Sequence, residues 1–465
     1  MLVTAAVLVL PGCTATATGA ASAAPPTPGA PGIGDPYFPL DGNGGYDVAR
    51  YLLDVTYAPD TDLLTGVAEV QARATQDLSA FNLDLSGLEV RSVTVDGEPA
   101  TFTREGGELT VTPAAPIAND AEFATVVGYD GVPATIEDAF GAAGFFHTPD
   151  GALVIGQPDV AATWFPANDH PLDPAAFTFR ITAPEGLEVL ANGVLEGATT
   201  DGGLTTTTWR ADAPMAPYLA GMAIGEFDVT ASEQDGIRYW DALDPALGPA
   251  GQIAGASLAR QPEVLAFLQG FFGPYPFDAA GGIVDELPEL AFALENQTRP
   301  IYAQAFFTDA VSGDSVVVHE LAHQWFGDSL PVAGWRDIWL NEGFATYAEW
   351  LWAEQEGRAT VQQQFEIVTA RPATNPFWTV PIGDPGPDRI FDEAVYVRGA
   401  MTLHALRLAV GDDAFFRILP EWAAQHAGRN VTTAEFVEHA ERVSGQQLDD
   451  LFTTWLVTPE KPADL

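Results

Sequence analysis

The stretch that decides the fold is His319-Glu320-Leu321-Ala322-His323, with Glu342 further along the chain. On an α-helix His319 and His323 lie one turn apart, so both imidazoles leave the same face and can reach one metal ion. A zinc ion in a hydrolase is held by three protein ligands and keeps one open position for water. We therefore predict one Zn²⁺ per chain, held by His319, His323 and Glu342.

Glu320 is adjacent to this ligand pair in sequence but lies round the helix from it. From that position its carboxylate can contact a metal-bound water and act as a general base rather than as a ligand. The residue types therefore predict a hydrolytic reaction in which Glu320 assists the attack of zinc-bound water.

The alternative to a metal site is an ordinary amphipathic helix with two surface histidines. The helix carrying the motif, which Asp314 or Ser315 can cap, is instead apolar nearly all round, and such a helix is buried. Buried imidazoles and carboxylates need partners, and a metal ion satisfies them together. A second helix, predicted from Asp337 to about Glu356, places Glu342 in its first turns. The apolar residues of the first helix are Val316, Val317, Val318, Leu321, Ala322, Trp325 and Phe326.

The composition limits the size of the fold and its partners. The chain has 465 residues, which is room for two or three domains. Its 64 acidic and 19 basic residues give a formal net charge of −45. A field of that sign argues against nucleic acid and anionic lipid as partners and favours cationic substrates. The more general explanation is an acidic, solvated surface that keeps an exported protein soluble.

The N-terminus resembles a processing signal. A short apolar run, residues 2–10, ends in Leu10-Pro11-Gly12-Cys13, which is similar to a bacterial lipobox. We predict that residues 1–13 are a lipoprotein signal peptide and that Cys13, the single cysteine, is lipidated. The alternative for a lone thiol is a small buried apolar residue. Lipidation predicts an exported protein on the extracellular face of a bacterial membrane, or one released as a secreted form, with membrane contact only through Cys13.

The remaining chain divides into three parts by composition. Residues 14–45 are rich in Ala, Pro, Gly and Thr, which predicts a tether. Residues 46–229 alternate with period two between turn pairs, which predicts a mostly antiparallel β domain. Residues 230–465 combine a small sheet with many helices, as in the thermolysin-type arrangement, so the predicted fold class is α+β. Expected strands include 50–57, 66–73, 90–95, 176–181 and 187–190, and expected helices include 257–272, 360–370, 394–410, 413–425 and 433–443.

Five separated segments carry a resemblance to a known family. The chain resembles the aminopeptidase N family of gluzincin zinc metallopeptidases, whose relatives include the bifunctional leukotriene hydrolases. The segments keep the family's order and together cover about residues 46 to 462. They are Trp164-Phe165-Pro166 with Asn168-Asp169-His170-Pro171, Ala293-Leu294-Glu295-Asn296, the zinc motif with Glu342 in Trp339-Leu340-Asn341-Glu342-Gly343-Phe344-Ala345, Tyr396-Val397-Arg398-Gly399-Ala400, and Leu451-Phe452 with Trp455-Leu456.

The resemblance implies a saddle-like N-terminal β domain followed by a thermolysin-like zinc peptidase domain. It also implies a zinc aminopeptidase that acts on peptides with a free N-terminus. Tyr396 would donate a hydrogen bond to the oxyanion, with Glu320 as the base. Glu295, with Ala293, Asn296 and the less closely matched Gln157, would bind the substrate and its free α-amine.

The chain departs from the family's pattern in two places. Phe292 and Leu294 replace the Gly and Met that usually flank the alanine of the amine-binding motif. This leaves open the backbone geometry there and the size of the first side chain. The sequence also resembles a short form without the helical C-terminal domain of many relatives, for which we expect a more open cleft.

Other functions stay open at this point. One is a zinc endopeptidase or an epoxide-hydrolysing relative with the same metal site, for which amine-blocked substrates would be preferred. Another is a surface lipoprotein that binds zinc and peptides without turnover, although a binding protein has no use for a general base. The preferred first residue and the oligomeric state are not predicted. The other histidines, which have no second ligand at metal spacing, are His147, His170, His404, His426 and His439.

Overall fold

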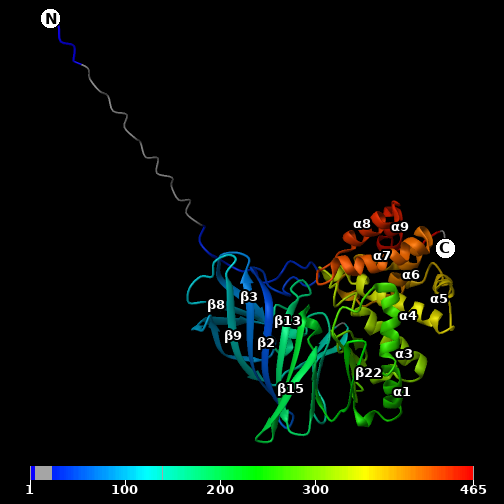
Figure 1. The fold of residues 1–465 in the computed structure, drawn as a ribbon, viewed down its shortest axis with the longest axis horizontal. Coiled ribbons are helices and arrows are strands. Elements are labelled where there is room, and N and C mark those ends of the chain that lie inside the picture. Colours follow the sequence, from blue (N-terminus) through cyan, green and yellow to red (C-terminus); the bar gives the residue numbers. More distant parts are fainter. Residues whose placement is uncertain (1, 6–23, 139, 464–465) are drawn as a thin grey trace.

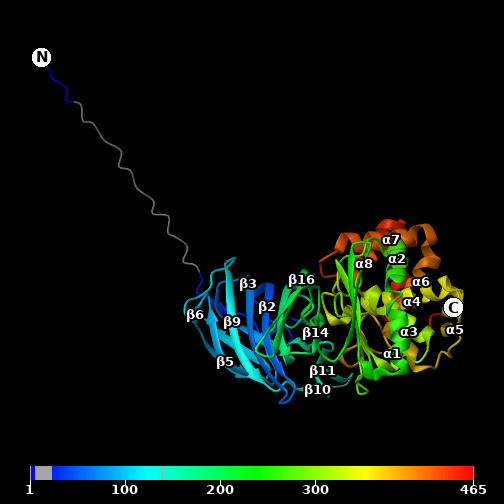
Figure 2. The same cartoon turned by 60° about the horizontal axis from the view of Figure 1, so that its bottom comes forward.

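The computed structural model describes residues 2–5, 24–138 and 140–463. Cys13 and most of the predicted signal peptide lie outside these residues, as do residues 14–23 of the predicted tether. Among the described residues, no helix combines the length and the apolar character that a membrane span requires. A β-rich N-terminal part and a helix-rich C-terminal part lie side by side (Figures 1 and 2).

The N-terminal part is built on an eight-stranded sheet in the order β15-β16-β13-β2-β3-β9-β5-β6. All neighbouring strands are antiparallel except β13 and β2, which run parallel. Side chains along β2 alternate between buried and exposed positions, as the period-two pattern predicts for a half-buried sheet. The strands are β2 (Tyr46–Ala58), β3 (Leu63–Ala74), β5 (Glu89–Val95), β6 (Glu98–Pro99), β9 (Glu122–Gly131), β13 (Ala175–Pro184), β15 (Val194–Asp201) and β16 (Leu204–Met215).

Two smaller sheets complete this part. A four-stranded sheet has the order β1-β4-β8-β7, and a five-stranded sheet has the order β10-β11-β12-β17-β14. The predicted mostly antiparallel β domain is confirmed. The strands are β1 (Thr27–Pro28), β4 (Leu78–Asp84), β7 (Thr101–Glu105), β8 (Glu108–Thr112), β10 (Thr135–Asp138), β11 (Gly141–His147), β12 (Ala152–Ile155), β14 (Glu188–Ala191) and β17 (Met222–Gly225).

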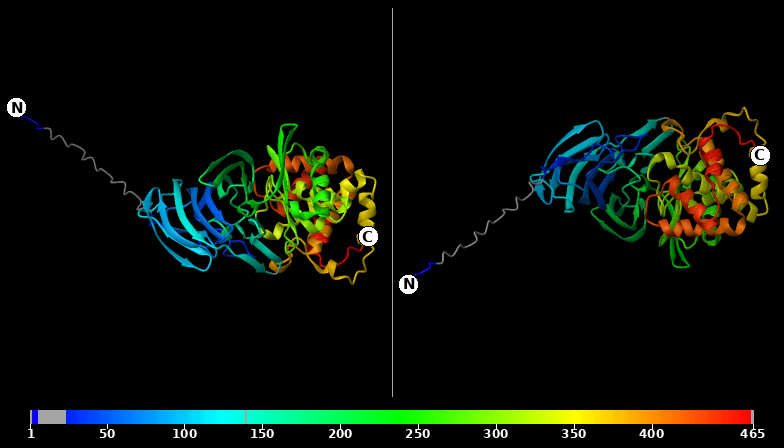
Figure 3. Two further views of the ribbon diagram at one scale, coloured as in Figure 1. Left: turned by 90° about the horizontal axis from the view of Figure 1, so that it is seen from below. Right: turned by 90° about the horizontal axis from the view of Figure 1, so that it is seen from above.

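The C-terminal part carries a five-stranded sheet in the order β18-β19-β20-β22-β21, with helices packed beside it (Figure 3). The α+β class is therefore confirmed. The sheets change between Gly225 and Asp228, a few residues before the predicted boundary at 229/230. The elements are β18 (Asp228–Gln234), β19 (Ile237–Leu243), β20 (Ala279–Asp285), β21 (Ala293–Leu294), β22 (Ile301–Ala303), α1 (Pro249–Leu258), α2 (Gln261–Phe272), α3 (Ala310–His323), α4 (Trp339–Gln355), α5 (Val361–Thr369), α6 (Glu393–Val410), α7 (Asp412–His426), α8 (Thr433–Ser444) and α9 (Asp449–Phe452).

The helix that carries the zinc motif begins earlier than predicted. Asp309, rather than Asp314 or Ser315, caps α3, because its carboxylate accepts hydrogen bonds from the backbone N–H groups of Val311 and Ser312. Asp314 lies inside the helix, where it pairs with Arg260 at 2.5 Å. The helix predicted over 257–272 is confirmed from Gln261 to Phe272, but its start differs, since residues 257 and 258 belong to a separate helix, α1, that ends at Leu258.

The described part of the predicted tether, residues 24–45, packs on the body of the protein. Thr27–Pro28 forms β1 beside β4, and Tyr37 donates a hydrogen bond to Asp384 in the C-terminal part. Asp35 is buried, and its carboxylate accepts from the backbone N–H of Trp335 at 3.1 Å. This stretch therefore crosses from one part to the other, which its Ala- and Pro-rich composition did not predict.

The two parts are also joined by a buried arginine. The Arg299 guanidinium lies 5.2 Å from the ring centroids of both Trp209 and Trp240. Its Nη1 donates to the carbonyl of Trp240 at 2.6 Å, and its Nη2 donates to that of Gly193 at 3.0 Å. Trp209 and Gly193 belong to the N-terminal part, and Trp240 belongs to the C-terminal part. The Arg299 side chain therefore contacts both parts of the protein.

Candidate active site

The three predicted metal ligands converge from two packed helices. His319 and His323 lie on α3, and Glu342 lies in the first turn of α4. Glu342 Oε2 is 3.3 Å from His319 Nε2 and 3.4 Å from His323 Nε2. The ligand atoms of all three residues lie within 4.8 Å of one another. The rings of Phe326 and Phe344, 4.2 Å apart, hold the ends of the two helices together.

The other nitrogen of each histidine is occupied by the protein. His319 Nδ1 lies 2.8 Å from Glu349 Oε1, and His323 Nδ1 donates to the carbonyl of Phe326 at 2.9 Å. Each imidazole thereby presents Nε2 to the site. This is the arrangement that orients histidines as zinc ligands, so the residues fit the ion. Glu349 was not predicted, although it lies two turns after Glu342 on the same helix face.

We expect Glu349→Gln to weaken zinc binding by about 10- to 100-fold with little change in fold, because the lost carboxylate orients and polarises His319. Competition with a chromogenic chelator would measure the affinity. The exposed Glu354 on the same helix gives a matched control, and Glu354→Gln should leave zinc affinity unchanged. Equal affinity of the Glu349→Gln variant and the wild type would contradict the orienting role.

The charged groups at the site shift one another's pKa values. Burial acts to raise the pKa of Glu342, but His323 and His319 outweigh it and lower that pKa to about 2. Burial, against the nearby His319 and His323, raises the pKa of Glu320 to about 8. A carboxyl whose pKa lies near neutrality is suited to take up and return a proton. A bound cation would lower the pKa of Glu320 again, and Glu320 would then be in the ionised form that a base requires.

A second carboxylate, Glu295, faces the ligands from the loop after β21. Its side chain is buried, and its carboxylate lies within 4.8 Å of ligand atoms of both Glu320 and His323. Gln157 Nε2 donates to Glu295 Oε1 at 2.9 Å, and the Tyr218 hydroxyl donates to the same oxygen at 3.0 Å. The structure thus brings the predicted Gln157 to Glu295 and adds Tyr218, which no sequence pattern indicated.

Tyr396 lines the same cavity as the metal ligands. It sits in the first turn of α6. Asp392 caps this helix, because its carboxylate accepts a hydrogen bond from the backbone N–H of Ala394. The rings of Tyr396 and His319 stack with centroids 6.0 Å apart. Burial and the nearby Glu342, Glu295 and Glu320 raise the pKa of Tyr396 well above its usual value. The hydroxyl therefore keeps its proton and remains a hydrogen-bond donor.

Two adjoining cavities meet at these residues. A cavity of about 410 Å³ holds His319, Glu320, His323, Glu342 and Glu295 in its lining. A neighbouring cavity of about 320 Å³ has an aromatic wall that includes Phe140 and Phe391, whose centroids lie 4.9 Å apart. Gln157, Phe292, Ala293 and Tyr396 line both.

Asn296 is placed differently from the other predicted substrate-binding residues. Ala293 lines both cavities, whereas Asn296 is part of neither lining. The Asn296 side chain is buried and donates from Nδ2 to the carbonyl of Leu219 at 2.9 Å. Its contact is therefore with the backbone of the N-terminal part rather than with the cleft.

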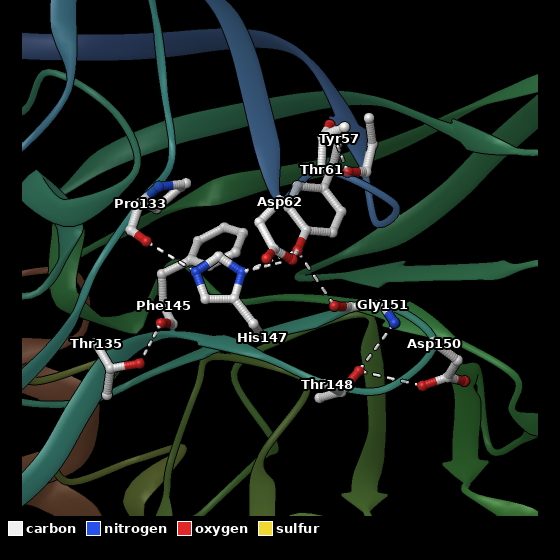
Figure 4. Close-up of polar contacts among 11 residues, drawn as sticks. Tyr57, Thr61, Asp62, Pro133, Thr135, Phe145, His147, Thr148, Asp150 and Gly151 are labelled. Atoms are coloured by element: carbon white, nitrogen blue, oxygen red, sulfur yellow. Dashed lines mark hydrogen bonds and ion pairs between the residues drawn. The ribbon is translucent and has the colours of Figure 1, made fainter.

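His147 belongs to a separate network at the end of β11 (Figure 4). Its Nε2 donates to the carbonyl of Pro133 at 2.8 Å, and its Nδ1 lies 3.0 Å from the Tyr57 hydroxyl and 3.2 Å from Asp62. These contacts tie the start of the β10–β11 hairpin to the turn between β2 and β3.

Comparison with known proteins gives matches over both parts of the chain. The family model described as Peptidase M1 N-terminal domain matches residues 47–219, and that described as Peptidase family M1 domain matches residues 262–455. The structure resembles a crystal structure of an M1 zinc metallopeptidase from Deinococcus radiodurans, with 28% identity, a TM-score of 0.81, and coverage of 93% of this chain and 98% of that one. A mutant of that protein bound to a Tyr-Ser-Ala substrate matches with 30% identity and the same TM-score and coverage.

Curated relatives are longer than this chain. Probable aminopeptidase 2 of Sulfurisphaera tokodaii is 25% identical over 411 residues, which are 82% of this chain and 50% of the relative. Human aminopeptidase N is 28% identical over 320 residues, which are 62% of this chain and 33% of the relative. The chain thus spans about half the length of the first of these relatives, and less of the second.

Proposed function

The chain belongs to peptidase family M1, and from that premise we propose that it is a zinc-dependent aminopeptidase, which releases N-terminal residues from peptides. One observation carries the proposal. The buried Glu295 carboxylate lies beside the metal ligands, with two neutral donors on one of its oxygens. A carboxylate there attracts the α-ammonium group of a peptide and fixes the distance from that group to the first peptide bond.

His319, His323 and Glu342 would hold the metal. When bound, Zn²⁺ polarises a carbonyl oxygen and makes water a stronger acid. Glu320, which lines the same cavity, would take the proton from the attacking water and return it to the leaving amine. The protonated Tyr396 hydroxyl would donate a hydrogen bond to the oxygen on which negative charge develops.

The test is hydrolysis of aminoacyl-fluorogenic amides and their N-acetylated copies, with and without chelator. We expect cleavage of the free-amine substrates only, and its loss with chelator. Equal cleavage of the acetylated copies would mean that Glu295 does not select an amine, and an endopeptidase would be the better interpretation. Zinc binding without turnover of any substrate would favour a binding protein.

We further infer that the protein is exported and anchored by a lipid on Cys13. The support is the apolar run that ends in Leu10-Pro11-Gly12-Cys13. Without this cysteine the lipid cannot be attached. We therefore expect Cys13→Ser to move the protein from the membrane fraction to the soluble fraction of a bacterial host. Incorporation of labelled fatty acid by the wild type alone would support the inference, and equal fractionation of both forms would contradict it.

A further inference from the structure

The loop that carries Glu295 is held from two sides by buried amide side chains. This loop runs from Glu295 to Pro300 and joins β21 to β22. Gln324 reaches it from the end of the metal-binding helix, and Asn192 reaches it from the N-terminal part. Both side chains are fully buried. We call these two residues the amide clamp.

Gln324 makes a two-point contact with the loop. Its Nε2 donates to the carbonyl of Glu295 at 3.0 Å, and its Oε1 accepts from the backbone N–H of Thr298 at 2.7 Å. Gln324 follows His323 directly in the chain. This side chain therefore connects the residue next to a metal ligand to the backbone of Glu295, the carboxylate proposed to bind the amine.

Asn192 fixes the loop from the other side. Its Nδ2 donates to the carbonyl of Gln297 at 2.8 Å and to that of Leu219 at 2.9 Å, and its Oδ1 accepts from the N–H of Gly221 at 2.8 Å. The carbonyl of Leu219 also accepts from Asn296. Leu219 follows Tyr218, which donates to Glu295 itself.

The contacts with Thr298 strengthen this clamp. Thr298 has a φ of +65°, a conformation that threonine rarely adopts and that surrounding contacts must hold. Its N–H donates to Gln324, and its Oγ1 accepts from the N–H of Gly193 at 2.7 Å. The loop is thus fixed at several backbone groups whose partners lie far away in sequence.

From this geometry we propose that Gln324 and Asn192 are positioning residues that set the distance between the metal and the α-amine of the substrate. The proposal rests on the aminopeptidase function proposed above. A substrate whose amine is bound at Glu295 reaches the metal with its first carbonyl only if this distance is held. A displacement of about 1 Å can cost about 10²-fold in rate.

The proposal can be tested by measuring how strongly the enzyme discriminates between α- and β-aminoacyl substrates. In a β-alanyl amide the amine lies one methylene further from the scissile carbonyl than in an α-alanyl amide. The wild type should therefore prefer the α-alanyl amide strongly. A loosened clamp should lower kcat on the α-alanyl amide more than on the β-alanyl amide, so that the ratio of the two kcat/KM values narrows.

The experiment measures this ratio in the zinc-loaded full chain with Gln324→Met, which keeps the side-chain length and removes both hydrogen bonds. We expect the ratio to fall at least about tenfold, mainly through kcat. Asn192→Asp keeps the acceptor for Gly221 and removes the donor to Gln297. It tests the clamp independently if Gln324→Met folds poorly. Zinc content and thermal denaturation report on folding.

A matched control is Gln261→Met, which removes a second fully buried glutamine whose amide donates to Asp241 rather than to the loop. Any loss of activity in Gln261→Met should lower kcat/KM on both substrates by the same factor and leave the ratio of the two values unchanged. An unchanged ratio in folded Gln324→Met and Asn192→Asp proteins would overturn the clamp while leaving the aminopeptidase proposal intact. A wild type that cleaves none of the free-amine aminoacyl amides would instead contradict the proposed function.

Discussion

Glu320→Gln is expected to lower kcat by about 10²- to 10⁴-fold while leaving zinc binding unchanged. The substitution keeps the size of the side chain and removes only its ability to accept a proton. Glu320 is buried on α3 between His319 and His323, and it is not one of the three residues that converge as the metal ligands. Zinc content by atomic absorption and steady-state kinetics on a free-amine substrate would measure the two effects.

The matched control for this variant is Glu349→Gln assayed with saturating zinc. That carboxylate touches His319 and not the reacting atoms, so its activity should recover when zinc is restored. Glu320→Gln should not recover at any zinc concentration. A Glu320→Gln protein with a normal kcat would place the general base elsewhere.

The metal ligands could be predicted because their spacing is local. His319 and His323 are one helical turn apart, and the apolar residues around them indicated a buried helix. Glu342 belongs to the next helix of the chain. Such a site depends on helix geometry and on one helix pair, both of which the sequence pattern encodes directly.

The residues that support the site could not be found in this way. Tyr218 and Asn192 lie far along the chain from the loop that they contact, and no local period connects such segments. Gln324 follows the zinc motif directly, but its partners Glu295 and Thr298 lie in a separate loop that no local period connects to it. Only Glu349 had a detectable signal, because it lies on the same face of its helix as Glu342.

The start of the metal helix shows a related limit. Asp309, Asp314 and Ser315 are all residue types that cap helices, and propensity does not rank them. The choice depends on tertiary contacts. Asp314 pairs with Arg260 and accepts a hydrogen bond from Ser257 of α1, so it is part of a helix–helix contact and not a cap.

The prediction of a tether is wrong for residues 24–45 for a similar reason. Their composition cannot bury much apolar surface, which is why a free segment was expected. They are instead held by polar contacts with distant partners. Asp35 accepts from Trp335, and Asn43 donates to Asp84 at 3.0 Å. Composition indicates how much a segment can bury, but it does not indicate which distant donors and acceptors will meet it.

Glu342→Gln is expected to abolish activity by loss of the metal. A neutral amide is a much poorer zinc ligand than a carboxylate, and the variant also loses the charge that offsets His319 and His323. Zinc content should fall well below one per chain, and activity should not return at zinc concentrations that saturate the wild type. The same assay on Glu354→Gln, an exposed change on the same helix, should give wild-type values. Full activity of Glu342→Gln would exclude this carboxylate as a ligand.

Zinc binding should also release at least one proton at neutral pH. Burial lowers the pKa of His323, but Glu342 and Glu295 outweigh it and raise that pKa to about 9 in the metal-free protein. Below this pH the imidazole holds a proton that zinc must displace, so zinc affinity should increase as the pH rises towards about 9 and fall as the pH drops. Calorimetric titration in two buffers of different ionisation enthalpy counts the protons released. A count of zero protons at pH 7 would show that His323 is already neutral at that pH. The contact of His323 with Glu342 argues against this outcome, because the carboxylate stabilises the charged imidazole.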